Sequence, residues 1–112
     1  MTTATDLRWI SICPYDRLTP ERGVAALIDG TQVAVFRSFD GSLFAISNID
    51  PFTGSAVLSR GIIGSRGSLV TVASPLHKQV FDLGTGQCLD DPEVSVAVFA
   101  VRIRDGQVEV GL

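Results

Sequence analysis

The chain has 112 residues, of which 46% are hydrophobic and 19% charged, and its formal net charge is −3. This composition is typical of a globular domain with an ordinary hydrophobic core, and it excludes a disordered chain. No run of Lys and Arg is present to neutralise phosphates, so nucleic acid is not an expected partner. The length predicts a single domain over residues 1–112.

The sequence contains no segment that predicts export or membrane insertion. Residues 2–6 have neither the basic nor the apolar region of a signal peptide. The longest apolar run, Val96–Val101, is far shorter than the roughly 20 residues needed to cross a bilayer. We therefore expect a cytoplasmic protein with no membrane partner.

Three Asp-Gly dipeptides predict hairpins along the chain. They lie at residues 29–30, 40–41 and 105–106. The strands that they join are expected at residues 24–28, 32–36, 43–46, 98–104 and 107–110, and β-branched runs predict two more at residues 8–12 and 68–73. No segment is long enough to nucleate a stable helix. Short strands between Gly-rich turns predict an all-β fold, an antiparallel sandwich or small barrel.

One of these strands alternates clearly between apolar and charged residues. Phe99, Val101 and Ile103 occupy one face of the segment at residues 98–104, and Arg102 and Arg104 occupy the other. Because side chains alternate between the two faces of a strand, we expect the apolar face in the core and the Arg face in solvent.

The middle of the chain reads as two loops rather than as regular strands. From residue 48 to residue 67, Pro, Gly and Ser are dense and the alternating pattern fails. A second loop follows at residues 74–79, and Gly84-Thr85-Gly86 turns the chain again. A short strand pair is expected between the two loops, as a small excursion from the main sheets. Loops on a rigid β scaffold are where binding sites usually lie. Residues 48–86 are therefore the expected functional region.

The arrangement of these segments resembles the Rieske-like fold over almost the whole chain. The resemblance rests on the strand Trp9–Ile12, on the segments at residues 33–37 and 40–46, and on residues 74–86, which read Ser-Pro-Leu-His-Lys-Gln-Val-Phe-Asp-Leu-Gly-Thr-Gly. A Rieske domain has Cys-x-His in its first loop and Cys-x-x-His in its second, and these residues hold a [2Fe–2S] cluster. The resemblance places the first-loop Cys and His positions at Asp50 and Phe52, and the second-loop positions at Ser74 and His77. It therefore implies loops that have lost three of four ligands.

Within this fold, the chain is more closely similar to the small subunits of cytoplasmic, assimilatory NAD(P)H-dependent nitrite reductases. The similarity rests on residues 48–52, 57–61 and 74–79, which read Asn-Ile-Asp-Pro-Phe, Val-Leu-Ser-Arg-Gly and Ser-Pro-Leu-His-Lys-Gln. It implies a large-subunit partner that carries FAD, sirohaem and a [4Fe–4S] cluster and reduces nitrite to ammonium. This chain would then have no cofactor, metal site or catalytic residue of its own.

The loop residues have structural as well as functional interpretations. Asp50, before a Pro, favours an Asx turn over a metal ligand. For Ser74 we expect a hydrogen bond within the loop, for example to a neighbouring amide. His77 is expected to hold the second loop or to contact a partner, since one imidazole cannot hold a cluster.

The tips of the two loops are the candidate docking surface for the partner. They consist of Pro51, Phe52, Thr53, Pro75, Leu76 and His77. Phe52 and Leu76 have two open interpretations. They fill the space between the loops, or they stand exposed as an apolar docking patch.

Two other functions are compatible with the residues. The first is a Rieske-type electron carrier with an unusual or intermolecular ligand set, which would need Cys13, Cys88 or His77 to reach iron. These two cysteines are isolated, with no His within four residues, and such cysteines are most often small buried hydrophobic residues. The second is a free-standing protein-interaction domain unrelated to nitrogen metabolism.

Overall fold

The computed structural model describes residues 7–76 and 78–112, which form an all-β structure. The strands are β1 (Trp9–Pro14), β2 (Arg22–Ile28), β3 (Thr31–Arg37), β4 (Leu43–Ser47), β5 (Ile62–Arg66), β6 (Leu69–Ala73), β7 (Val80–Asp82), β8 (Val98–Arg104) and β9 (Gln107–Gly111). Two short 3-10 helices, η2 (Tyr15–Arg17) and η3 (Leu58–Arg60), interrupt them. No helix in the described ranges is long and apolar enough to cross a membrane.

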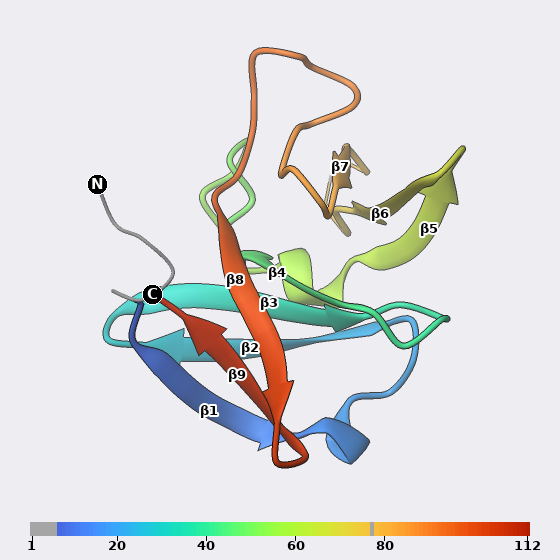
Figure 1. Ribbon diagram of the computed structural model, residues 1–112. Helices are drawn as coiled ribbons and strands as arrows, with labels where there is room; N and C mark the ends of the chain where they lie inside the picture. Colours follow the sequence, from blue (N-terminus) through green and yellow to red (C-terminus); the bar gives the residue numbers. More distant parts are fainter. Residues whose placement is uncertain (1–6, 77) are drawn as a thin grey trace.

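Six strands form one strongly curved antiparallel sheet in the order β1-β9-β8-β4-β3-β2 (Figure 1). The curvature brings β1 and β2, its two edge strands, towards each other, so the sheet is barrel-like. Tyr15 in η2 links this region to the β3–β4 turn, because its hydroxyl donates to the Gly41 carbonyl at 2.8 Å. The guanidinium of Arg37 lies 4.4 Å from the centre of the Tyr15 ring. The predicted all-β, barrel-like fold is confirmed.

The hairpins occur where the Asp-Gly pairs predict them. Asp29 and Gly30 both have positive φ, at 50° and 82°, and they join β2 to β3. Asp105 and Gly106 repeat this geometry between β8 and β9, at 52° and 77°. Two central residues with positive φ are the signature of the tight turn that suits the twist of a hairpin.

Strand β3 is buried on both of its faces and divides the core into two clusters. Ala34 and Phe36 pack in one cluster with Leu58 of η3, Val72 of β6 and Phe81 of β7. The alternate residues Val33 and Val35 pack in the other cluster, inside the barrel, with residues that include Leu18, Ile28, Val108 and Val110. The near-continuous apolar sequence of β3 follows from this position between two layers.

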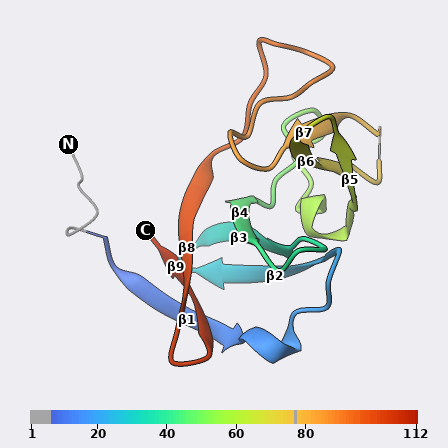
Figure 2. The ribbon, with the colours of Figure 1, turned by 45° about the vertical axis from the view of Figure 1, so that its right-hand side comes forward.

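The second sheet has three strands in the order β5-β6-β7 and stands at one end of the barrel-like sheet (Figures 1 and 2). A two-residue turn at Gly67 and Ser68 joins β5 to β6, and Gly67 has a φ of 63°. The short strand pair expected between the two loops is confirmed, and β6 lies within the run predicted at residues 68–73. The bounds of β5 were not predicted, because it lies in the segment where the alternating pattern fails. The loops before β5 and after β6 carry the predicted functional residues.

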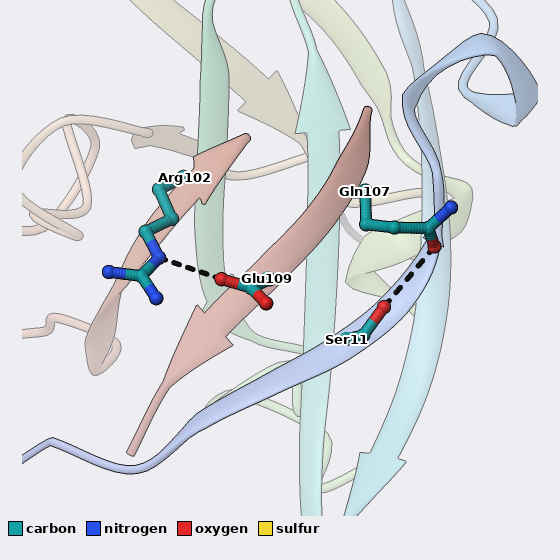
Figure 3. A network of polar contacts seen from close by, with 4 residues as sticks. All are labelled: Ser11, Arg102, Gln107 and Glu109. Carbon is teal, nitrogen blue, oxygen red and sulfur yellow. Dashed lines mark hydrogen bonds and ion pairs between the residues drawn. The ribbon is translucent and has the colours of Figure 1, made fainter. Parts of the chain in front are cut away.

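The outer face of the barrel at β1, β8 and β9 carries a polar network (Figure 3). Arg102 donates to the Glu109 carboxylate at 2.7 Å, and Ser11 donates to Gln107 at 3.2 Å. The Arg102 guanidinium also lies 3.9 Å from the centre of the Trp9 ring. This stacking leaves Arg102 half-buried, whereas the alternation predicted that it faces solvent.

The other departure from the predicted alternation is Ile103, which is 48% exposed. Ile103 is paired with the buried Val108 and shares its inward face. However, β4 pairs with β8 only at Val98 and Phe99, so the Ile103 end of β8 extends beyond its neighbour. A side chain on the inner face is buried only where another strand continues beside it.

Candidate functional site

The first loop is anchored at its start by a buried asparagine. The Asn48 side-chain oxygen accepts a hydrogen bond from the Ser59 amide at 2.7 Å, and its carbonyl accepts one from the Leu58 amide at 3.1 Å. The Asn48 amide donates to the Gln32 carbonyl at 3.0 Å. These bonds connect the loop to both η3 and the β2–β3 hairpin, so the loop starts from a fixed position.

Asp50 shapes the tip of the first loop from a buried position. Its Oδ1 accepts from the Phe52 amide at 2.9 Å, and its carbonyl accepts from the amides of Thr53 at 3.2 Å and Gly54 at 2.7 Å. A carboxylate that bonds the backbone amide two residues later forms an Asx turn. The turn interpretation of Asp50 is therefore correct.

The second oxygen of the same carboxylate joins the two loops. Asp50 Oδ2 accepts a hydrogen bond of 2.5 Å from the hydroxyl of Ser74, and both residues are buried. Hydrogen bonds to a carboxylate are short and strong, and a low-dielectric environment strengthens them further. The shortest contact of the Ser74 hydroxyl is therefore with the other loop, while the expected bond from a neighbouring amide, that of Leu76, is present but longer.

Within the second loop, Ser74 also organises its own turn. Its amide donates to the Gln79 carbonyl at 2.9 Å, and its carbonyl accepts from the Lys78 amide at 3.0 Å. The Leu76 amide lies 3.4 Å from the Ser74 hydroxyl oxygen, a long contact. One serine thus closes its own loop and fixes it to the loop that contains Asp50.

Phe52 combines features of the two interpretations left open. Its ring lies 6.3 Å from that of Phe81, centre to centre, with the planes tilted by 51°. Phe81 is fully buried, whereas Phe52 is 38% exposed and Leu76 is 49% exposed. Phe52 therefore packs on the core through one part of its ring and presents the rest to solvent.

The other docking candidates lie at the surface, as far as they are described. Pro51, Thr53 and Pro75 are exposed. His77 lies outside the described residues. The structure thus brings together Asp50 and Ser74, and it places Phe52 and Leu76 at the surface of their respective loops. The assignment of Asp50, Phe52, Ser74 and His77 as former ligand positions stays a prediction.

The residues present do not fit the [2Fe–2S] group of a Rieske domain. Such a site needs two thiolates and two imidazoles, and the chain has one His. Cys88 is buried in the core cluster that contains Phe81, and Cys13 packs against the cluster inside the barrel. Burial raises the pKa of the Cys13 thiol, an effect that Arg17 partly opposes. Within residues 7–76 and 78–112, no group of three or more His, Cys, Asp or Glu residues is placed to hold a metal ion.

Sequence reasoning missed two features of this site. The role of Asn48 as an anchor was not predicted, although its position before a Pro- and Gly-rich loop was a usable signal. The bond between Asp50 and Ser74 spans 24 residues along the chain, so no local pattern could indicate it.

Three comparisons place the chain among known proteins. Residues 8–111 match the family model of the Rieske-like [2Fe-2S] domain. The chain is 47% identical over 104 residues to the nitrite reductase (NADH) small subunit of Escherichia coli, covering 92% of this chain and 96% of that protein. It is also similar to the crystal structure of a candidate NADH-dependent nitrite reductase small subunit from Mycobacterium tuberculosis, with a TM-score of 0.92, 51% identity, and 95% and 96% of the two chains covered.

A large subunit also contains a matching segment. The nitrite reductase [NAD(P)H] large subunit of Klebsiella oxytoca is 36% identical over 103 residues, which are 92% of this chain and 11% of that protein. The identity, the coverage and the shared fold lead to one assignment. The chain belongs to the Rieske-like domain family and, within it, to the nitrite reductase (NADH) small subunits.

Proposed function

We propose that this chain is the small, cluster-free subunit of a cytoplasmic, assimilatory NAD(P)H-dependent nitrite reductase. It binds a large subunit that carries FAD, sirohaem and a [4Fe–4S] cluster and reduces nitrite to ammonium. The observation that supports this most directly is the buried bond between Asp50 and Ser74. It holds the two loops together through protein atoms alone, so they need no metal to keep their shape.

The match to the Klebsiella oxytoca large subunit supports a direct contact between the two kinds of chain. A segment of that large subunit is similar to nearly the whole of this chain. A domain that is covalently part of one enzyme and separate in another is expected to keep its position by non-covalent contacts in the second case. The large subunit is therefore the expected partner here.

The loop tips are the proposed docking surface for that partner. Pro51, Phe52, Thr53, Pro75, Leu76 and His77 form it. Phe52 and Leu76 supply apolar area, and rigid turns set by Asp50 and Ser74 hold it in place. Half-exposed apolar side chains on fixed loops are suited to binding, because little conformational freedom is lost on docking.

The first test is the iron and acid-labile sulfide content of the anaerobically purified protein, together with its visible spectrum. We expect a colourless, iron-free protein, because the donor set does not fit a [2Fe–2S] cluster. Stoichiometric iron with Rieske-like absorption would contradict the cluster-free assignment and favour an electron carrier.

The second test is co-expression with the large subunit. We expect the two chains to co-purify, and we expect NADH-dependent nitrite reduction to fall when the small subunit is omitted. Full activity of the large subunit alone, with no co-purification, would refute the proposed function and favour a free-standing interaction domain.

A further inference from the structure

A groove runs beside strand β5. The residues that line it are not those of the two loop tips. Its larger cavity, of about 470 Å³, is lined by residues that include Arg22, Arg60 and Ile62. Its smaller cavity, of about 290 Å³, is lined by residues that include Phe39 and Ser65. Both cavities share Glu21 and Ile63, so they adjoin along the strand. We call this feature the β5 groove.

The groove borders an open edge of the small sheet. Within residues 7–76 and 78–112, β5 pairs only with β6, because the sheet order is β5-β6-β7. The two-residue turn makes Arg66 and Leu69 a hydrogen-bonded pair, and pairs alternate along an antiparallel ladder. The backbone N–H and C=O groups of Ile63 and Ser65 therefore point away from β6. Among the described residues, neither amide has a backbone hydrogen-bond partner outside the ladder.

The two most exposed large apolar side chains of the described residues flank this groove. Ile62 is 76% exposed and lines the larger cavity, and Phe39 is 75% exposed and lines the smaller one. Phe39 comes from the β3–β4 turn, which lies on the same side of the molecule as β5 in both views (Figures 1 and 2). Such a pair beside an open backbone edge is typical of a site that adds a strand from another chain.

The larger cavity is lined by more positive than negative side chains, and this restricts what binds there. Arg22 and Arg60 line it with one acidic residue, Glu21, although the whole chain has a net charge of −3. The two ion pairs of the described residues, Arg8–Asp29 and Arg102–Glu109, involve neither of these Arg side chains. The complementary ligand therefore has an acidic residue at this end.

From these features we infer that the β5 groove binds an extended segment of the nitrite reductase large subunit, which adds to β5 as a fourth strand. The segment forms backbone hydrogen bonds with Ile63 and Ser65, covers Phe39 and Ile62 with apolar side chains, and places an acidic residue against Arg22 and Arg60. This contact is separate from the loop tips, and it rests on the proposed function only in requiring the large subunit as partner.

The main test is the dissociation constant of the complex between the full-length small and large subunits. The double variant Phe39→Ser/Ile62→Ser is expected to bind at least tenfold more weakly than the wild type. Leu27→Ser is the matched control, because Leu27 is 67% exposed at the other end of β2 and lies outside the groove, and it is expected to bind within twofold of the wild type.

The outcomes separate this inference from the proposed function. If the wild type does not bind the large subunit, the proposed function fails. If the wild type and the double variant bind equally well, the β5 groove inference alone is wrong. If the isolated small subunit is a dimer that the double variant dissociates, a second copy occupies the groove, and the inference is also wrong.

Hydrogen exchange of single amides tests the strand addition without a variant. In the free protein, the Ile63 and Ser65 amides are expected to exchange quickly and the Gly64 amide slowly, because only the last points to β6. Binding of the large subunit is expected to slow exchange at Ile63 and Ser65 at least tenfold. Unchanged rates in a saturated complex would overturn the inference.

A charge reversal tests the acidic end of the segment. Arg60→Glu is expected to weaken binding at least tenfold at low ionic strength and by less at high salt, since salt screens surface charges. Arg104→Glu changes an exposed Arg at the end of β8 in the same way and is expected to have little effect. Equal effects of the two variants would show that binding depends only on the overall charge of the chain. That result would contradict a local contact at Arg60.

Discussion

A single hydrogen bond between the Asp50 carboxylate and the Ser74 hydroxyl joins the two loops. If the predicted match to the Rieske pattern holds, these two positions correspond to cysteines that share one iron. Here a carboxylate and a hydroxyl meet directly at 2.5 Å in a buried environment. The loops can therefore keep their arrangement without a cluster.

Removal of the Ser74 hydroxyl leaves one oxygen of a buried carboxylate without its partner. Ser74→Ala is therefore expected to lower the free energy of unfolding by about 1.5–3 kcal/mol. Urea denaturation measures this value. Ser68→Ala, in the exposed β5–β6 turn, is the control and should stay within about 0.5 kcal/mol.

A double-mutant cycle with Asp50→Asn tests whether the two residues act through each other. We expect the double variant to lose less stability than the sum of the single variants. Additive losses would show that the bond between them contributes nothing.

Phe52 is expected to affect both stability and binding. Phe52→Ala should lower the free energy of unfolding by about 1–2 kcal/mol, because the ring loses its contact with Phe81 and part of its buried area. It should also weaken the complex with the large subunit. A thermal melt and a pull-down measure the two effects. Because the Leu76 side chain is more exposed than that of Phe52, Leu76→Ala should show a smaller loss of stability with a similar loss of binding. Unchanged stability and binding in Phe52→Ala would contradict both roles.

At the scale of elements, turn chemistry was the most reliable guide. The Asp-Gly pairs at residues 29–30 and 105–106 predicted tight hairpins, and their positive φ values show the reason. The bounds of β5 were not predicted, since Ile62–Arg66 is an edge strand in which only Ile63 packs on the core, too little to produce an alternating pattern. Edge strands are defined by a neighbour, here β6, and not by their own sequence.

The β3–β4 turn contains a carboxylate that makes stability depend on pH. Hydrogen bonds from the Ser38 hydroxyl at 2.5 Å and from the Ser42 amide at 3.0 Å lower the pKa of Asp40. Because the pKa is lower in the folded state, Asp40 stabilises the fold above the unfolded pKa of about 3.9, and this contribution is lost as pH falls through the folded pKa.

The variant Asp40→Asn isolates this effect. Below about pH 4, urea denaturation should show that the wild type loses stability more steeply than Asp40→Asn. Above about pH 6, where the carboxylate is charged in both states, the difference between the two proteins should not change with pH. Parallel curves over the whole range would show that the turn does not lower this pKa.

At the scale of the molecule, the sequence allowed the fold class to be predicted but not the way its layers connect. The barrel-like fold class, the hairpins and the two loops follow from local patterns and from the family resemblance. The burial of β3 between two clusters does not, because it requires Leu58, Val72 and Phe81 to pack on the outer side of Ala34 and Phe36. The β5 groove likewise arises from segments far apart in the chain, as Phe39 and Ile62 show.

The position of β3 has a consequence for unfolding, because one strand supplies both clusters. We expect the barrel and the small sheet to unfold in a single transition, as small domains usually do. Fluorescence of Trp9 reports the barrel, and the NMR signal of Val72 reports the small sheet, so both should change at the same urea concentration. Leu58→Ala, a buried truncation in the outer cluster, should lower the free energy of unfolding by about 2–5 kcal/mol and shift both probes together. A shift of Val72 alone would show two independently folding units and would contradict a single domain over residues 1–112.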